Sequence, residues 1–282
     1  MRGTAVGTLV SLGLLAAAVS ARAADDGAPL PWQPVAAGAD QATLEIDGQP
    51  ALRLFRFDLE RFRAEVVVGK GLPPQPHTAG ELRHARGAVA AVNGGFFDER
   101  VVPLGLRIAD GETRFPLRTK ADWGVLVLAG HRARIVHTRD YPALAAGAAT
   151  AGGSARIDGA IQVGPRLLVD GVPTKLRPQL ARRTAVALDH DGRALTLIVA
   201  AEPIDANELA AQLAAAGFAD ALLLDGGPST QASLELGDVH LEVAGAYPVP
   251  DLLAIFNRPP PRKVNGPSPA AASPTTRDPR HP

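Results

Sequence analysis

Short apolar runs, and stretches in which apolar and polar residues alternate, recur along most of the chain and predict a strand-rich fold. Asp-Gly pairs separate several of them, as at Asp47-Gly48 and Asp191-Gly192, and such pairs favour tight turns between antiparallel strands. The fold class is therefore expected to be α+β, a single strand-rich mixed domain with a few packed helices. The expected strands cover residues 42–46, 51–58, 64–69, 88–92, 104–109, 124–128, 134–137, 160–164, 167–169, 184–189, 194–201, 221–224, 232–236, 239–243 and 252–256.

Two segments begin with residues that favour a helix start, and we expect helices over 79–85 and 206–216. In each, a capping residue is followed three positions later by a glutamate, which is the spacing of a capping box. Gly217 follows the second segment at the position where a left-handed residue ends a helix. Segment 141–153 is rich in small residues and is expected to be either a loop or a weak helix. The two capping pairs are Thr78 with Glu81 and Asp205 with Glu208.

The two ends of the chain differ in composition from the middle. Residues 1–23 carry a positive charge at Arg2, a short apolar core and a small-x-small site, which indicate a signal peptide cleaved after Ala23. The apolar core is shorter than the ~20 residues that a membrane span needs, so no membrane span is expected after cleavage. The mature protein is therefore expected to be periplasmic or secreted. Residues 24–41 are expected to form a loose leader, 42–257 the folded domain, and 258–282 a disordered Pro-rich tail.

Composition and charge exclude several classes of function. The 282 residues carry no formal net charge and only 4% are aromatic, so the sequence shows neither a basic nucleic-acid footprint nor a stacking platform for single strands. The absence of cysteine excludes disulfides, thiolate metal sites and a cysteine nucleophile. The histidines show no metal-binding spacing. We expect no metal site and no required cofactor, and a divalent cation at Asp225 is the alternative.

The apolar run 221–224 stops abruptly at a carboxylate, Asp225. The pattern predicts a buried strand followed by a loop whose glycines let backbone approach a ligand closely. Two interpretations are open: a turn in which Asp225 caps its own backbone, or a binding loop at the end of a rigid strand. The loop lacks the ending of a nucleotide-binding P-loop, and no G-x-G-x-x-G opens a helix in this chain. Its residues after Asp225 are Gly226-Gly227-Pro228-Ser229-Thr230.

Three further segments combine strand ends with glycine and polar groups. With the Asp225 loop they form an ordered set: Val92-Asn93-Gly94-Gly95-Phe96-Phe97, Gly164-Pro165 followed by Leu167-Leu168 and Asp170-Gly171, Arg183-Thr184-Ala185-Val186-Ala187, and Leu224-Asp225-Gly226-Gly227-Pro228-Ser229. In order and spacing, from about residue 77 to 256, the set resembles the phosphodiester glycosidase family. Pro228 and Ala187 depart from the pattern where relatives commonly have glycine, and Pro228 lacks a backbone N–H that could bind phosphate.

The resemblance implies cleavage of a sugar-1-phosphodiester, so the expected partner is a carbohydrate phosphodiester substrate. It implies Arg183 as the permanently charged partner of the phosphate, with a structural ion pair as the alternative role. Asp225 is implied as the acid/base or as the group that stabilises the anomeric centre. Asn93 is suited to a sugar hydroxyl or N-acetyl group, or else caps the strand end. The resemblance also implies that the two Gly-Gly loops, with Gly94, Gly95, Gly226 and Gly227, bind the substrate. Ser229 and Thr230 are expected either to donate to the phosphate or to satisfy the loop backbone.

Glycosidases usually use two carboxylates, and the sequence does not fix the second one. Asp98 and Glu81 are the candidates, and completing a capping box is the alternative role of Glu81. Two other functions are left open. One is a non-catalytic cell-envelope protein of the same fold that binds a glycan or an anionic polymer, and the other is a glycosidase that acts on ordinary O-glycosides.

Overall fold

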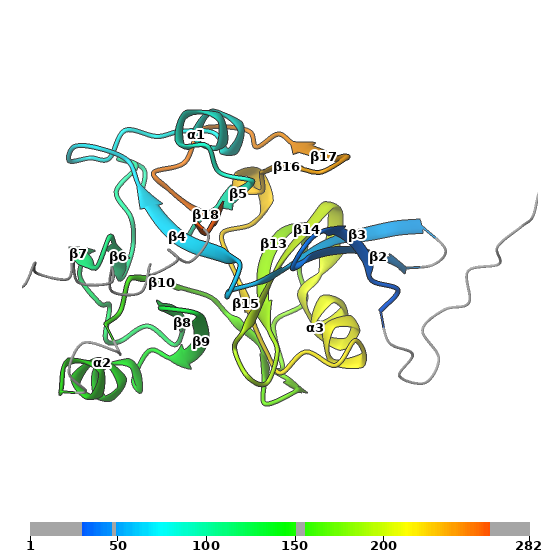
Figure 1. Cartoon of the computed structure of the whole chain (residues 1–282). Coiled ribbons are helices and arrows are strands. Elements are labelled where there is room, and N and C mark those ends of the chain that lie inside the picture. Colours follow the sequence, from blue (N-terminus) through cyan, green and yellow to red (C-terminus); the bar gives the residue numbers. More distant parts are fainter. Residues whose placement is uncertain (1–29, 47–48, 151–155, 260–282) are drawn as a thin grey trace, which may run out of the picture.

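Three antiparallel sheets surround one hydrophobic core in the computed structural model, which describes residues 30–46, 49–150 and 156–259 (Figure 1). Each sheet turns one face toward this core, as Val186, Leu126 and Leu253 illustrate with one buried side chain from each sheet. Residues at alternate positions of a strand share a face, so the alternation in the sequence is what places these side chains together.

The largest sheet has eight strands, in the order β1-β2-β3-β14-β13-β15-β11-β12. Its strands are β1 Gln33–Ala36, β2 Ala39–Ile46, β3 Gln49–Asp58, β14 Ala194–Asp205, β13 Leu180–Leu188, β15 Asp220–Leu223, β11 Arg166–Val169 and β12 Val172–Pro173.

The other two sheets have five strands each. In sheet order, one consists of β7 Glu112–Phe115, β6 Arg107–Ala109, β10 Gly159–Val163, β8 Gly124–Ala129 and β9 Arg132–His137. The other consists of β17 Val239–Val243, β16 Ala232–Leu236, β5 Ala90–Asn93, β18 Asp251–Asn257 and β4 Phe62–Val68.

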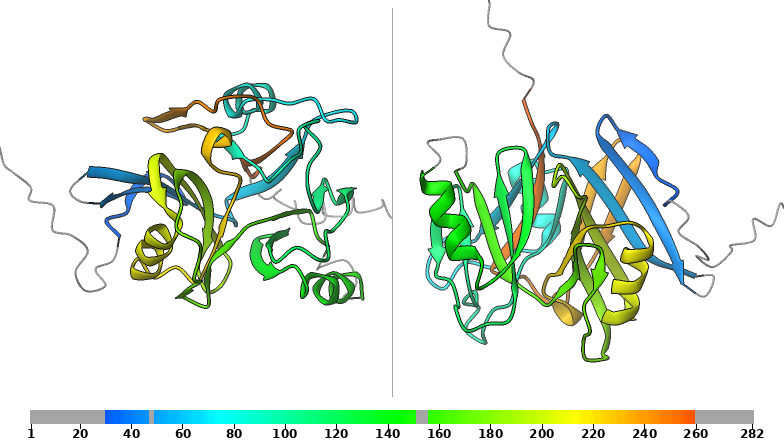
Figure 2. Two further views of the ribbon diagram at one scale, coloured as in Figure 1. Left: turned by 180° about the vertical axis from the view of Figure 1, so that it is seen from behind. Right: turned by 90° about the horizontal axis from the view of Figure 1, so that it is seen from below.

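Each sheet is covered on its outer face by one of the three α-helices in the described residues. Helix α3, Ala206–Ala215, buries Leu209 and Leu213 against the largest sheet. Helix α1, Ala79–Arg86, packs on the sheet that contains β5 and β18, and α2, Tyr141–Thr150, packs on the sheet that contains β8. Figure 2 shows α2 and α3 on opposite sides of the molecule. None of the helices in the described residues is long and apolar enough to cross a membrane.

Antiparallel pairing brings the end of one strand beside the beginning of its neighbour. Asn93, at the end of β5, pairs with Leu252 near the start of β18. Leu223, at the end of β15, pairs with Ala185 on β13. The loops that carry the polar motifs therefore emerge from adjacent strand ends.

Most of the expected elements are confirmed, and the α+β fold class with them. The capping box of α1 is present, because the side chains of Thr78 and Glu81 bond to each other's backbone N–H groups. Gly217 has a positive φ of 81°, as expected after α3. Segment 141–150 is the helix α2, and the remainder of the predicted segment up to residue 153 lies outside the described residues.

Two expectations are wrong. Of the predicted loose leader, 24–41, residues 33–36 form β1 and residues 39–41 begin β2, and both join the edge of the largest sheet through backbone hydrogen bonds, while residues 24–29 lie outside the described residues. In α3, Asp205 is the N-cap, but no capping box forms, because the Glu208 carboxylate accepts a hydrogen bond from Gln212 at 2.7 Å instead. The predicted signal peptide, 1–23, lies outside the described residues, as does the predicted tail beyond residue 259.

Candidate active site

The loop that follows β15 is joined directly to the loop that follows β5. The backbone N–H of Asp225 donates to the carbonyl of Gly94 at 2.9 Å, and Nδ2 of Asn93 donates to the carbonyl of Asp225 at 2.6 Å. Two of the four sequence motifs thus meet at Asp225.

Asn93 is the residue that connects the motifs. Its side chain is fully buried, and its Oδ1 accepts from Oγ1 of Thr184 at 2.7 Å and from the backbone N–H of Gln231 at 3.1 Å. Both ends of the amide are therefore occupied by protein groups from three separate segments. In this structure Asn93 holds the loops together instead of presenting its amide to a ligand, and sugar binding by Asn93 stays a prediction.

Asp225 is a half-buried carboxylate at the centre of this junction. Its Oδ1 accepts from the backbone N–H of Gly226 at 3.0 Å. Burial raises the pKa of Asp225, and the nearby charge of Asp251 raises it further, while Ser229, Gly226 and the positive charge of Arg107 oppose the rise. A carboxyl whose pKa is raised keeps its proton to a higher pH than an ordinary one, which suits it to proton transfer in catalysis.

Asp251 and Arg107 form an ion pair beneath the loop, with both side chains fully buried and Oδ1 of Asp251 3.1 Å from Nε of Arg107. The Nε–H is not aligned for a hydrogen bond, and Oδ2 of Asp251 has no hydrogen-bond partner. Burial raises the pKa of Asp251, and Arg107 and the N–H of Gly95 oppose this. We take Asp251 to be ionised at neutral pH, because a buried guanidinium, which cannot lose its proton, needs a counter-charge.

The same ion pair holds the glycine loop. The N–H of Gly95 donates to Oδ1 of Asp251 at 2.9 Å, and the N–H of Gly94 donates to the carbonyl of Asp251 at 2.9 Å. A Cβ on Gly94 would collide with Oδ1 of Asp251, and one on Gly95 would collide with the guanidinium of Arg107. These two glycines are therefore required by close packing inside the protein, and their role in substrate binding stays a prediction.

Sequence reasoning did not identify Asp251 or Arg107 as part of the site. Each is a single charge in an apolar strand, in Asp251-Leu252-Leu253 and in Leu106-Arg107-Ile108. A charge inside an otherwise buried strand needs a partner, and this pattern is the signal by which the two residues could have been found.

Arg183 lies beside the Asp225 loop, but two of its nitrogens are already bonded. Nη2 donates to the carbonyl of Gln179, and Nε donates to that of Ile204 at 3.4 Å. Burial lowers the pKa of Arg183, and Asp205 opposes the change. Nη1 is 3.8 Å from the position that a Cβ on Gly226 would take, so this edge faces the loop. The bonds to the two carbonyls use two of the five guanidinium N–H groups and leave those of Nη1, on the side of Gly226, for a phosphate.

The two carboxylates proposed as partners of Asp225 have local roles. Asp98 accepts from the backbone N–H groups of Arg100 and Val102 at 2.9 and 3.0 Å, and the Val102 hydrogen bond is the main cause that lowers the pKa of Asp98. Hydrogen bonds to Thr78 likewise lower the pKa of Glu81. Among the described residues, Asp251 is the carboxylate whose charge acts on Asp225.

The remainder of the Asp225 loop turns inward. Gly227–Ser229 form a single turn of 3-10 helix, η1, which places the buried Ser229 near Asp225 and near the hydroxyl of Tyr247 at 3.4 Å. Thr230 is fully buried, and its Oγ1 has no hydrogen-bond partner. Pro228, which stands where relatives commonly have glycine, is exposed. Ala187, the other departure from the family pattern, lies in the core beneath α3 and does not line the site.

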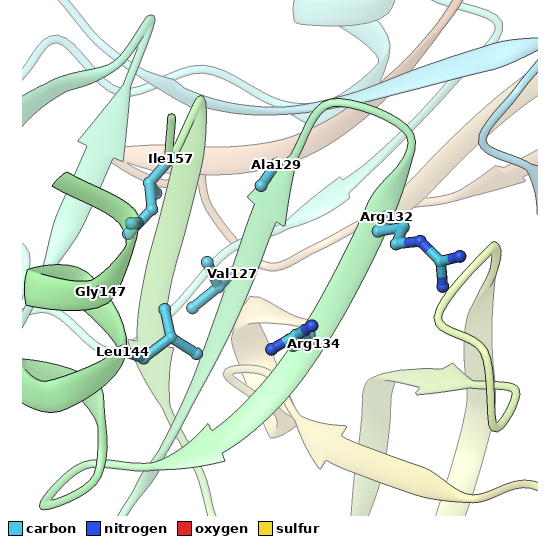
Figure 3. A pocket seen from close by; sticks show the side chains of 8 residues that line it. Val127, Ala129, Arg132, Arg134, Leu144, Gly147 and Ile157 are labelled. Atoms are coloured by element: carbon cyan, nitrogen blue, oxygen red, sulfur yellow. The ribbon is translucent and has the colours of Figure 1, made fainter. Parts of the chain in front are cut away.

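A cavity of about 480 Å³ lies elsewhere, between α2 and strands β8 and β9 (Figure 3). Apolar side chains such as Val127 and Leu144 line it together with Arg132 and Arg134, and no carboxylate does. It is therefore separate from the Asp225 junction. No group of three or more His, Asp or Glu residues in the described ranges could hold a metal ion.

The chain matches the model of the phosphodiester glycosidase family over residues 86–256. No curated protein matches it. Among solved structures, the zebrafish N-acetylglucosamine-1-phosphodiester alpha-N-acetylglucosaminidase catalytic domain, auto-inhibited by its pro-peptide, is similar with a TM-score of 0.56 and 17% identity, over 80% of this chain and 85% of that one. A hypothetical protein from Synechocystis has a TM-score of 0.52 and 15% identity, over 78% and 62% of the two chains. A Burkholderia pseudomallei protein described as a "putative exported protein" has a TM-score of 0.54 and 13% identity, over 74% and 75%. At these identities the structures support the fold alone.

Proposed function

The chain belongs to the phosphodiester glycosidase family, and from that premise we propose that it is an exported hydrolase that cleaves the glycosidic bond of a sugar-1-phosphodiester in a glycan or glycolipid. The observation that carries the proposal is the position of Asp225. It is a half-buried carboxylate with a raised pKa, fixed where the motif loops meet and tied through Gly94 to a buried ion pair.

In the proposed reaction, Asp225 acts at the anomeric centre. It either protonates the departing oxygen or stabilises the positive charge that develops on the sugar. The C1–O bond to phosphate breaks and water supplies the oxygen that replaces it on C1. The departing group is a phosphate monoester, which leaves readily, so the second role requires less proton transfer. Arg183, with Nη1 facing Gly226, is the proposed partner of the phosphate, since a guanidinium carries a permanent charge and a planar set of donors.

Turnover of defined substrates tests the proposal. The purified protein is incubated with a panel of sugar-1-phosphodiesters, and release of the free sugar is followed. We expect Asp225→Asn to lower kcat with little effect on KM, and Arg183→Ala to impair both. Asp98→Asn is the matched control, because Asp98 is a carboxylate whose bonds lie within its own loop.

Three outcomes would count against the proposal. Folded protein that turns over none of the diesters would refute hydrolysis, and binding without product that Asp225→Asn leaves unchanged would favour the non-catalytic alternative. If Arg183→Lys left kcat and KM for a diester unchanged, recognition of phosphate by Arg183 would lose its support, and an ordinary O-glycosidase would become the better description.

The proposal of export rests on the composition of residues 1–23. The similar Burkholderia protein, described with the word "exported", agrees with it. N-terminal sequencing of protein recovered from fractionated cells is the test. We expect a mature chain that begins at Ala24 in the periplasmic or secreted fraction, and an intact Met1 end in the cytoplasm would contradict export.

A further inference from the structure

A second cavity, of about 470 Å³, lies beside the loop that leads into β8. We call it the Trp123 pocket and define it by its lining residues, Leu117, Arg118, Thr119, Lys120, Ala121 and Trp123. β8 begins where β10 ends, because Gly124 pairs with Val163. The pocket therefore lies where the chain crosses from β10 to the Gly164-Pro165 motif.

Trp123 contacts segments that adjoin the Asp225 junction on two sides. Its ring meets the ring of Phe96, the residue after Gly95, edge to face at a centroid distance of 5.0 Å. Its Cα and Cβ are 3.3 Å from the position that a Cβ on Gly164 would take. The next residue, Pro165, accepts a hydrogen bond from the N–H of Leu223 at 3.0 Å, two positions before Asp225. The Trp123 pocket thus borders the same cluster of strand ends as the candidate site.

The loop is fixed from below by a buried amide. Gln162 is fully buried, and its side chain accepts from the backbone N–H of Arg118 at 2.9 Å and donates to the carbonyl of Arg118 at 3.0 Å. The carbonyl of Gln162 in turn accepts from Arg107 at 3.0 Å. The backbone of Arg118 is thus clamped at both of its polar groups and joined to the ion pair that holds the Asp225 loop.

The Trp123 pocket is positively charged. The side chains of Arg118 and Lys120 are exposed, and among the described residues neither lies within ion-pair distance of a carboxylate. The guanidinium of Arg118 lies 5.7 Å from the centroid of the Trp123 ring, within cation–π range. The one acidic residue of the loop, Asp122, bonds to His137 at 2.6 Å. Two cations of the described residues therefore line the Trp123 pocket without a carboxylate within ion-pair distance.

We propose that the Trp123 pocket is an anion subsite that binds a negatively charged part of the substrate beyond the diester phosphate, so that the preferred aglycone is a sugar or polyol carrying its own phosphate or carboxylate. This rests on the proposed function. Arg118 and Lys120 supply the charges and Thr119 supplies a hydroxyl, and the volume of about 470 Å³ is within the range of small-molecule sites. A neutral aglycone would leave both cations without a partner.

A binding measurement that needs no turnover forms the first test. The chain has two tryptophans, so Trp32→Phe leaves Trp123 as the sole reporter of indole fluorescence. Titration with sorbitol 6-phosphate is expected to change this fluorescence saturably, and titration with sorbitol is not. Arg118→Gln/Lys120→Gln should weaken the binding of sorbitol 6-phosphate about tenfold, which corresponds to about 0.7 kcal/mol for each exposed cation and lies within the range for surface ion pairs.

The matched control removes the same amount of positive charge, two arginines, from turns that do not line the Trp123 pocket. Arg61 and Arg193 are exposed and lie in the turns before β4 and before β14. Arg61→Gln/Arg193→Gln should leave the binding of sorbitol 6-phosphate unchanged. Equal losses in the two double variants would mean that general electrostatic attraction, and not the Trp123 pocket, holds the anion, and this would overturn the inference.

The second test compares two diesters of one sugar, with a glycerol and with a glycerol-phosphate aglycone. Arg118→Gln/Lys120→Gln should lower the ratio of kcat/KM for the charged over the neutral diester about tenfold, and the control pair should keep it. An unchanged ratio, or no response of Trp123 to sorbitol 6-phosphate, overturns the subsite. Fluorescence binding that the double variant weakens, with neither diester hydrolysed, upholds the subsite and refutes the proposed function.

Discussion

Replacing Asp251 by asparagine would leave the guanidinium of Arg107 buried without a counter-charge. Asparagine has nearly the same shape and still offers an oxygen to the N–H of Gly95, so the change removes charge and little packing. Removing one partner of a buried ion pair typically costs about 3–5 kcal/mol. Burial raises the pKa of Asp251, which means that its charge is costly to desolvate, and Asp251→Asn recovers part of this cost. We therefore expect a loss of stability at the lower end of this range.

The matched control is Asp40→Asn. Asp40 pairs with Arg56 at 2.7 Å, a shorter contact than the 3.1 Å of the buried pair, but the side chains of Arg56 and Asp40 are 36% and 27% exposed. Surface pairs of this kind contribute about 0–1 kcal/mol. Contact distance alone would rank Asp40→Asn as the more damaging change, whereas burial ranks Asp251→Asn far above it.

Urea and thermal unfolding at pH 7, followed by circular dichroism, measure the difference. For a domain of this size, about 3 kcal/mol corresponds to a decrease in Tm of about 6–12 °C, and the control should lose at most about 4 °C. Similar losses in the two variants would refute the reasoning that burial makes the Asp251–Arg107 pair essential. Arg107→Met should be at least as damaging as Asp251→Asn, because Arg107 also donates to the carbonyls of Phe96, Leu106 and Gln162.

Three further predictions concern the loops around this pair. Asp225→Asn should be more stable than the wild type at neutral pH, because a raised pKa means that ionised Asp225 lowers the free energy of unfolding. This difference in stability should shrink as the pH falls through the pKa of folded Asp225, and it should vanish below the ordinary carboxyl range. Denaturant titrations at several pH values measure it. Gly94→Ala should abolish folding, because the new Cβ would overlap Asp251, and soluble yield and circular dichroism measure this. Gly87→Ala is the control: no atom lies within 4 Å of its new Cβ, so the variant should lose only about 1 kcal/mol of stability, which comes from the positive φ of residue 87. Asp98→Asn should leave kcat unchanged in the diester assay, and a large loss would restore Asp98 as the second carboxylate.

The sequence predicted the strands well because alternating burial is a local pattern. It failed at 33–36, where Pro, Ala and Gly suggested a loose leader. An edge strand such as β1 requires only backbone hydrogen bonds to one neighbour, so its side chains need not show the pattern of a buried strand. At α3, Glu208 had the spacing of a capping box, but a glutamate on an exposed helix surface can also bond four residues ahead, and the spacing alone does not choose between the two.

The position of the candidate site could be predicted from the sequence, but the contacts that hold its loops in place could not. Asp225 and the two Gly-Gly loops are visible in the sequence, because glycine next to a polar residue at a strand end is a strong local signal. The reason for Gly94 is not visible, since it depends on Asp251, which lies far away in the chain and reaches the loop only when β18 pairs with β5. Asn93 illustrates the same limit, because its type suits a ligand and its burial shows that its amide is used inside the protein.

The buried pair links the position of Asp225 to its charge. Its hydrogen bonds hold Gly94, which accepts the N–H of Asp225, and its two members act on the pKa of Asp225 in opposite directions, Asp251 raising it and Arg107 lowering it. A change at either member would therefore alter stability and acid strength together. Arg118 is joined to the same pair through its backbone and through the rings of Trp123 and Phe96. Neither Arg118 nor Lys120 is among the groups that shift the pKa of Asp225, so their removal should change binding and leave the acid strength of Asp225 unchanged. The acidity of Asp225 and the proposed recognition of a charged aglycone thus depend on separate side chains, so we expect that the two can be altered independently.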